Sequence, residues 1–274
     1  MMSELSLYFS YPFVRYAFIC GVLISMCAAL LGVTLVLRRY SFMGDGLSHV
    51  AFGALAVSAV LSVTNDLLIV IPVTMITAIL LLGLTEKKKI KGDSALAMMS
   101  VSAVAVGYIL LNVFSTSANI SGDVCSSLFG STSILTLTKQ DAVFAFVMTV
   151  VVGVLFVLIY NKVFTITFDR NFSKATGVNV GLANLILSVI ISIVVVMSMR
   201  LVGALLTSAV IIFPALCSMR LFSSFRNVTI SSVVIGMISS AFGIVLSILL
   251  STPVGATIVV VDLLIYIAVT VIKK

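Results

Sequence analysis

Long apolar segments alternate with short polar segments along the whole 274-residue chain. Several apolar segments approach about 20 residues, the length that crosses the hydrocarbon core of a bilayer as a helix. The sequence therefore predicts an all-α polytopic membrane helix bundle of about eight or nine transmembrane helices, with residues 1–274 forming a single transmembrane domain. The nine candidate spans are Phe13–Leu37, Gly46–Val63, Leu67–Leu84, Ser94–Ser115, Ala142–Tyr160, Val180–Met199, Leu201–Leu221, Val228–Leu250 and Val254–Ile272.

Three parts of this assignment stay open. The second candidate span is short, and only Arg200 separates the sixth from the seventh. The segment Thr116–Asp141 is long enough to dip into the membrane. If the two spans around Arg200 are not separate crossings, the count falls to seven.

Lys and Arg residues are unevenly distributed between the two sets of predicted loops. If Arg38 and Arg39 are cytoplasmic, the alternation of nine spans places thirteen of the sixteen Lys and Arg residues on the cytoplasmic side. Arg15, Lys139 and Arg200 fall on the other side. Short cytoplasmic loops of membrane proteins are enriched in Lys and Arg. The asymmetry therefore supports nine spans and predicts an outside N-terminus and a cytoplasmic C-terminus.

Composition agrees with a membrane protein and narrows the possible functions. Only 9% of the residues are charged and 61% are hydrophobic, whereas soluble chains average about 25% charged residues. The net charge of +7 does not indicate a nucleic-acid partner, because the basic residues form no continuous face. The sequence has no G-x-x-x-x-G-K-[ST] phosphate-binding loop. We therefore expect an integral membrane protein that is embedded in membrane lipid. We also expect that it is not an enzyme and does not hydrolyse ATP unaided.

Asp45 and His49 are polar residues at positions that a membrane span disfavours. They lie in the string M-G-D-G-L-S-H at 43–49, and His49 is the only histidine of the chain. On a helix, side chains four residues apart project from one face, one turn apart. A carboxylate oxygen and an imidazole nitrogen placed in this way suit a divalent cation such as zinc or manganese. At 1.5 Å per residue, His49 lies about 15 Å from Arg38, near the middle of the bilayer.

A purely structural explanation of the same residues stays open, in which Asp45 caps the second helix and His49 bonds a neighbouring carbonyl. Two ligands are also too few for a closed metal site. Metal binding therefore implies a homodimer whose facing copies supply two Asp and two His, unless water or other residues complete the shell. Asp262 lies inside the last span, where a carboxylate costs at least about 2.5–3.5 kcal/mol, so we expect it to have a partner or a function.

The segment at 168–178 reads as a short helix in a cytoplasmic loop. Asp169 is a good N-cap, Lys174 falls near the negative helix end, and Gly177 suits the position after the C-cap. Phe168 and Phe172 are four residues apart, and two exposed aromatic side chains suit insertion into a groove on a partner protein. The alternative is an amphipathic turn that lies on the lipid headgroups.

Four segments, in order along most of the chain, carry motifs that occur together. The string R-R-Y-S-F-M-G-D-G-L-S-H-V-A-F-G at 38–53 resembles the R-R-x-x-x-x-G-D-A-L-S-H signature of the permease subunits of zinc/manganese/iron ABC importers. F-D-R-N-F-S-K-A-T-G-V at 168–178 is similar to the cytoplasmic F-D-x-x-x-A-x-x-x-G-V/I loop of that family, and residues 202–215 are similar to its V-G-x-L-L…P-A helix. T-P-V-G-A-T at 252–257 is similar to the turn before the last span, although Ser251 and Thr252 replace the usual acidic position.

This resemblance implies a homodimeric permease that moves a divalent zinc, manganese or iron ion inward by alternating access across the cytoplasmic membrane of a prokaryote. It implies a separate cytoplasmic ABC ATPase and an extracytoplasmic metal-binding protein as partners, and no permanently bound cofactor. It also implies that Asp45 and His49 are the metal ligands. Ser48 and Asp262 are candidates for supporting the ligands, although Asp262 is not part of the family pattern. The residues that it assigns to ATPase coupling are Phe168, Asp169, Phe172, Lys174 and Gly177.

Two functions of other classes remain possible from the residues alone. A secondary metal carrier driven by a proton or sodium gradient would use Asp45, His49 and Asp262 as a proton relay. A membrane assembly or anchor protein would transport nothing.

Overall fold

The computed structural model describes residues 8–86, 92–114, 137–204 and 206–273. The regular secondary structure of these residues is helical. These residues contain no strand. The helices are α2 (Pro12–Leu37), α3 (Met43–Val60), α4 (Leu67–Glu86), α5 (Gly92–Phe114), α7 (Lys139–Phe168), α8 (Arg170–Ala175), α9 (Val180–Val202), α10 (Thr207–Leu221), α11 (Phe225–Leu250) and α12 (Val254–Ile272).

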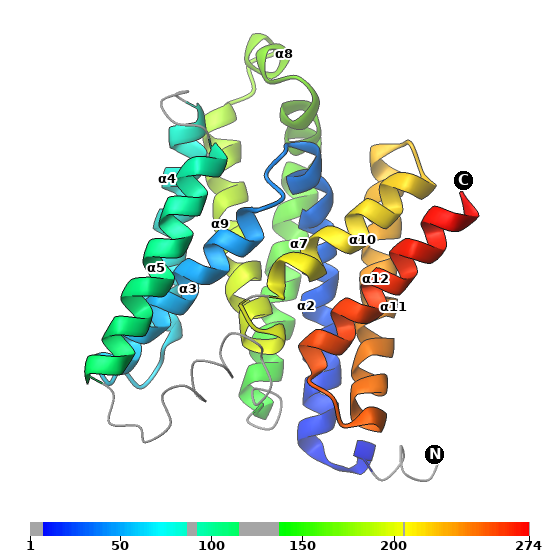
Figure 1. Ribbon diagram of the computed structural model, residues 1–274. Coiled ribbons are helices and arrows are strands. Elements are labelled where there is room, and N and C mark those ends of the chain that lie inside the picture. The colour runs from blue at the N-terminus through cyan, green and yellow to red at the C-terminus, as the bar shows by residue number, and fades with distance from the viewer. Residues whose placement is uncertain (1–7, 87–91, 115–136, 205, 274) are drawn as a thin grey trace.

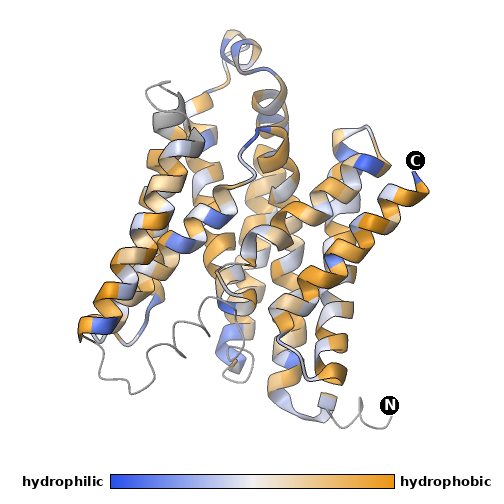
Figure 2. Cartoon of the chain, viewed as in Figure 1, coloured by the Kyte–Doolittle hydropathy of each residue, from blue (hydrophilic) through white to orange (hydrophobic). Residues whose placement is uncertain are grey.

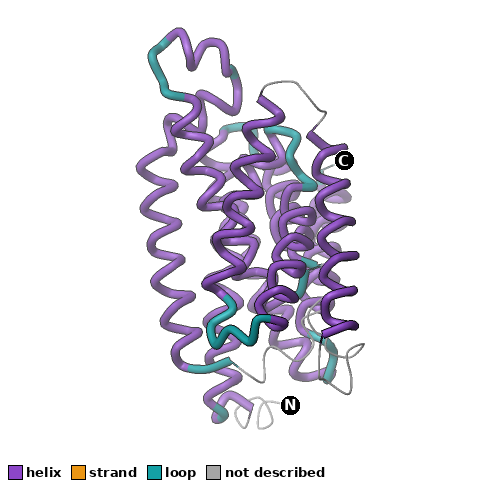
Figure 3. Tube along the Cα trace, turned by 90° about the vertical axis from the view of Figure 1, so that its left-hand side faces the viewer, coloured by secondary structure: helices purple, strands orange, loops and turns teal. Residues whose placement is uncertain are grey.

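The long helices run alternately up and down between two ends of the molecule (Figures 1 and 3). Within the described residues, seven are long and apolar enough to cross a membrane, and two shorter apolar helices, Leu67–Leu82 and Thr207–Leu221, complete the set. The N- and C-terminal ends of the chain lie at opposite ends of the bundle, and α8 lies at the same end as the C-terminus (Figure 1). The predicted all-α membrane bundle is confirmed, and its alternation agrees with the predicted sidedness.

Two predicted span boundaries are wrong. The fifth span does not end near Tyr160, because α7 continues to Phe168. Lys162 made this segment look like a loop, but a Lys near a membrane surface can extend its charged head to water while its stem stays apolar. The seventh span does not begin at Leu201, because α9 continues through Val202 and α10 begins only at Thr207. Residues 87–91 lie outside the described residues, as do residues 115–136, which form most of the candidate re-entrant segment Thr116–Asp141. The last residues of that segment, Lys139–Asp141, begin α7.

Helix α2 forms the centre of the bundle through small residues. Its neighbours include α11, α10, α7 and α9, and Ala28 and Ala29 have no exposed surface. The Ser232 hydroxyl of α11 donates a hydrogen bond of 2.9 Å to the Ala29 carbonyl. The Gly32 Cα lies so close to the Ile211 carbonyl of α10 that a Cβ would collide with it. Such close approach is how membrane helices gain van der Waals contact in lipid, where no hydrophobic driving force acts between them.

Hydrophobic residues predominate along the long helices (Figure 2), and many large apolar side chains are exposed on the outside of the bundle. Val157 and Leu158 of α7 are 72% and 71% exposed, and Met98 of α5 is 71% exposed. On a soluble protein so large an apolar surface would mark an interaction site. On this bundle it is the surface that faces lipid or a second subunit.

A methyl group at Gly32 tests this close packing. We expect Gly32→Ala to lower the stability of the purified protein by about 1–3 kcal/mol, because the α2 and α10 backbones must separate to admit the new methyl group. Gly153→Ala is the matched control, since its Cβ would meet nothing within 4 Å. Thermal unfolding in detergent measures both variants. Equal melting temperatures for the two would contradict the described α2–α10 contact.

Candidate metal site and coupling helix

The first turns of α3 bring Asp45 and His49 together. The His49 Nε2 lies 3.7 Å from the Asp45 Oδ1, and the side chains are 13% and 36% exposed, respectively. The alternative that Asp45 caps this helix is wrong: the N-cap is Phe42, no side chain caps α3, and Asp45 lies inside its first turn. The His49 Nδ1 is buried without a hydrogen-bond partner among the described residues.

The separation of these two atoms fits one metal ion. Nitrogen and oxygen ligands lie about 2.0–2.2 Å from zinc. Two donors 3.7 Å apart then subtend an angle of roughly 120° at the ion, close to the tetrahedral range. The side chains therefore need to move only by tenths of an ångström to chelate a single cation.

One copy of the chain does not complete such a site. The described residues contain no group of three or more His, Cys, Asp or Glu side chains that could hold a metal ion. A transition metal that prefers four or more ligands therefore needs donors beyond this pair.

A break between α9 and α10 lies next to these residues and was missed in the sequence. Gly203 leaves the helix with φ 94° and ψ 159°, a backbone region that is essentially restricted to glycine. The Ser48 hydroxyl of α3 lies 2.7 Å from the Ala204 carbonyl in this break. Gly203 was the available signal, but it reads equally well as a small residue that packs helices.

Asp262 lies on α12 and is only 1% exposed. Both of its carboxylate oxygens lack a hydrogen-bond partner among the described residues. The main neighbours of α12 are α11 and α10. A supporting role for Asp262 beside Asp45 and His49 stays a prediction.

The short helix α8 forms as its sequence indicates. The Asp169 carboxylate accepts hydrogen bonds of 2.9 Å from the backbone N–H groups of Asn171 and Phe172. Lys174 lies in the last turn. Gly177 has φ 77°, and its N–H donates to the Lys174 carbonyl at 3.1 Å, so it ends the helix in the left-handed conformation that glycine favours.

Phe168 and Phe172 do not share a helix, contrary to the predicted spacing. Phe168 is the last residue of α7, and Asp169 is extended, with φ −146°, because an N-cap residue must leave the helical conformation. The Phe168 ring contacts Phe164, with centroids 4.9 Å apart, and Phe225 at the start of α11, with centroids 6.1 Å apart. Phe172 is 58% exposed on α8. Phe168 therefore connects the α8 region to α11, but its side chain is still 61% exposed, so both aromatic side chains remain available to a partner.

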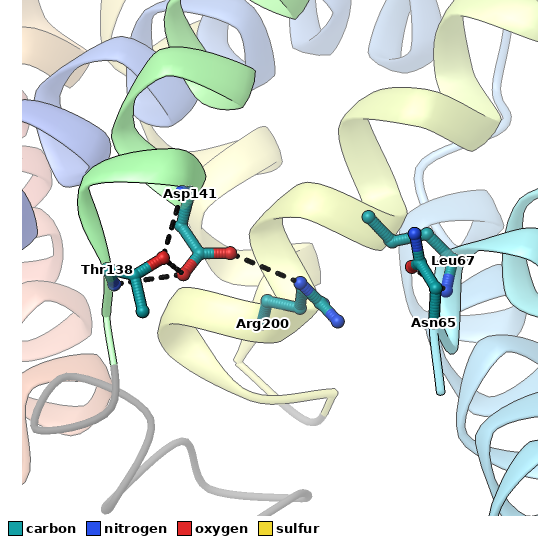
Figure 4. A network of polar contacts seen from close by, with 5 residues as sticks. All are labelled: Asn65, Leu67, Thr138, Asp141 and Arg200. Atoms are coloured by element: carbon teal, nitrogen blue, oxygen red, sulfur yellow. Dashed lines mark hydrogen bonds and ion pairs between the residues drawn. The ribbon is translucent and has the colours of Figure 1, made fainter. Parts of the chain in front are cut away.

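Asp141 and Arg200 join α7 to α9 at the opposite end of the bundle (Figure 4). The Asp141 Oδ2 accepts hydrogen bonds from the Thr138 N–H at 2.9 Å and the Thr138 hydroxyl at 2.7 Å. The Asp141 N–H donates to the Thr138 hydroxyl at 3.3 Å, which completes a capping box. The other carboxylate oxygen, Oδ1, lies 3.6 Å from the Arg200 Nη1. This pairing was not predicted, because the two residues are far apart in sequence.

Comparison with known proteins identifies the family. The ABC 3 transport family matches residues 10–273. The chain belongs to the ABC 3 transport family. This assignment confirms the sequence resemblance, and the permease is a multi-pass protein of the cell membrane.

Named relatives of the permease span nearly its whole length. The zinc uptake system membrane protein ZnuB of Buchnera aphidicola subsp. Acyrthosiphon pisum is 27% identical over 241 residues, which cover 88% of this chain and 90% of that protein. The manganese transport system membrane protein MntC of Halalkalibacterium halodurans is 26% identical over 265 residues, or 95% and 88% of the two chains. The manganese import permease ScaB of Streptococcus parasanguinis is 28% identical over 249 residues, or 91% and 86%.

A solved structure shares the fold of the permease. PsaBC from Streptococcus pneumoniae, in complex with Fab, superimposes with a TM-score of 0.86 at 25% sequence identity, covering 98% of this chain and 95% of that chain. The permease is thus a transport subunit. These findings do not support the alternative of a self-sufficient secondary carrier.

Substitutions of the residues in Figure 4 separate the contribution of the Asp141–Arg200 ion pair to stability from that of the capping box of α7. We expect Arg200→Gln to cost less than about 1 kcal/mol of stability, because both partners are about one-third exposed and such ion pairs are weak. Asp141→Ala also removes the carboxylate half of the capping box, in which Oδ2 accepts from the Thr138 N–H, so we expect it to cost up to about 1 kcal/mol more. Thermal unfolding in detergent measures the difference. An equal loss in the two variants would contradict the capping role of Asp141.

Proposed function

We propose that this permease works as a homodimer in which Asp45 and His49 of each copy bind a transported divalent metal ion between the subunits. The observation that carries the proposal is the 3.7 Å approach of the His49 Nε2 to the Asp45 Oδ1 on one face of α3. The pair has the separation that one ion requires, and no third His, Cys, Asp or Glu among the described residues joins it. Two facing copies supply two carboxylates and two imidazoles, a closed set of four ligands.

The ligand chemistry favours a first-row transition metal. The relatives are named for zinc and for manganese, and nitrogen and oxygen donors suit zinc, manganese and iron. Two Asp45 carboxylates balance the double positive charge of the ion. This balance lowers the cost of holding a divalent cation inside the bilayer, where an isolated charge is expensive.

Transport then proceeds by alternating access, powered by a cytoplasmic ABC ATPase. An extracytoplasmic binding protein delivers the ion to the opening between the two copies. ATP binding and hydrolysis on the partner move α8, and its neighbour Phe168 passes the movement to Phe225 of α11 through their ring contact. When the two copies rock apart on the cytoplasmic side, the Asp45–His49 pair of one copy separates from the pair of the other copy. A pair of ligands holds the ion less tightly than four do, so the ion leaves inward.

The metal ligands are tested by replacements that keep their shape. We expect Asp45→Asn and His49→Gln each to abolish uptake of radioactive zinc or manganese into proteoliposomes that contain the permease, its ATPase and its binding protein. Dimer assembly should remain, because neither side chain makes a hydrogen bond that holds helices together among the described residues. Asp66→Asn, just before the start of α4, is the control. Its carboxylate accepts a hydrogen bond of 2.8 Å from Ser58, so it should affect stability but not uptake. Normal uptake by either ligand variant rules out the site.

Phe172 tests the coupling surface on α8. We expect Phe172→Ala to weaken binding of the ATPase and to lower metal-stimulated ATP hydrolysis several-fold, with no change in metal affinity. Phe242→Ala is the matched control, because Phe242 on α11 is 60% exposed, like Phe172, but lies within a membrane span. ATPase binding is measured by co-purification from detergent. Unchanged binding and hydrolysis would instead place Phe172 on the lipid headgroups.

A further inference from the structure

The break between α9 and α10 requires partners for the backbone groups that it frees. The α9 helix ends at Val202, and α10 begins at Thr207. In a membrane, non-helical backbone is stable only where the protein satisfies its polar groups. The Thr207 hydroxyl donates a hydrogen bond of 2.8 Å to the Gly203 carbonyl, and the Ala204 carbonyl is the acceptor that faces α3.

Ser48 of α3 supplies the donor for Ala204. Its hydroxyl lies 2.7 Å from the Ala204 carbonyl oxygen and 2.7 Å from the Asp45 carbonyl oxygen. A hydroxyl has one hydrogen to donate, so the two carbonyls share it. The Ser48 side chain has no exposed surface, so neither water nor lipid can take its place.

Close packing prevents the break from moving independently of α3. A Cβ on Gly44 of α3 would lie 2.9 Å from the Ile211 side chain and 3.5 Å from the Ser208 Cα of α10. On the other side, a Cβ on Gly255 of α12 would collide with the Val202 carbonyl. The break is therefore held between the first turn of α3 and the first turn of α12. Interiors packed this closely transmit displacements rather than absorb them.

We propose that Ser48 is a positioning residue: its hydrogen bond to the Ala204 carbonyl fixes the rotation of α3 about its own axis and thereby sets the placement of Asp45 and His49 around the ion. The proposal rests on the proposed metal-transport function and adds a specific link to it. Ser48 directly precedes His49 and follows Asp45 by three residues, so a rotation of α3 at this point moves both ligands together. The α9–α10 break is thus the element against which the metal site is aligned.

Cobalt bound to the purified dimer tests this link, because the visible absorption of Co²⁺ reports coordination geometry. We expect Ser48→Ala to retain Co²⁺ binding with altered absorption bands and with about 10-fold or more weaker affinity, the usual effect of removing a residue that orients metal ligands. Ser192→Ala on α9 is the matched control. Ser192 is equally buried, but its hydroxyl donates 2.8 Å to Ser188 of its own helix, so the spectrum and affinity should stay as in the wild type.

Each outcome decides the question. Unchanged Co²⁺ absorption and affinity in Ser48→Ala, or an equal change in Ser192→Ala, overturns the positioning role. If Ser48→Ala does not yield a folded dimer, Ser48→Cys replaces it, since a thiol keeps the side-chain shape but is only a weak hydrogen-bond donor to the Ala204 carbonyl. An unchanged spectrum then overturns the proposal. Wild-type Co²⁺ binding that persists in Asp45→Asn and His49→Gln overturns the metal site itself, a result distinguishable from failure of the Ser48 link alone.

Discussion

Lipid offers no hydrogen bonds, and this constraint governs both the fold and the proposed site of the permease. The bundle satisfies its backbone within helices, and several buried hydroxyls bond a carbonyl one turn back, as Thr74 bonds Val70 at 2.7 Å. Departures from this rule are costly and are therefore informative. They include the interrupted helix at Gly203, the buried imidazole nitrogen of His49 and the carboxylate of Asp262.

Two of these departures occur at one place. The break is bonded to Ser48, and Ser48 lies between Asp45 and His49 on α3. Discontinuous helices with ligands near the middle of the bilayer are a general feature of membrane transporters. The proposed site therefore combines a local pair of metal donors with an irregular backbone segment bonded to the residue between them, whereas α8 lies at the end of the bundle that holds the C-terminus (Figure 1).

Features set by local sequence were predictable, and features set by tertiary packing were not. The Asp45–His49 pair and the caps of α8 depend on residues a few positions apart, so helical geometry alone places them. The end of α7 differs from the prediction because a charged residue such as Lys162 is as common in a loop as at the end of a membrane helix. The α9–α10 break, the Asp141–Arg200 pair and the contact of Phe168 with Phe225 each join distant segments, and a single sequence gives no measure of such proximity. The proposed metal site depends in addition on a second copy of the chain.

The central claim is that paired copies of Asp45 and His49 hold the transported ion at the subunit interface. Anomalous X-ray diffraction from crystals of the zinc- or manganese-loaded dimer, recorded at the absorption edge of the metal, tests this claim most directly. The account predicts a single anomalous peak on the two-fold axis, within coordination distance of both Asp45 carboxylates and both His49 rings. A peak elsewhere in the membrane region, or a loaded dimer in which these side chains face away from the interface, would contradict it.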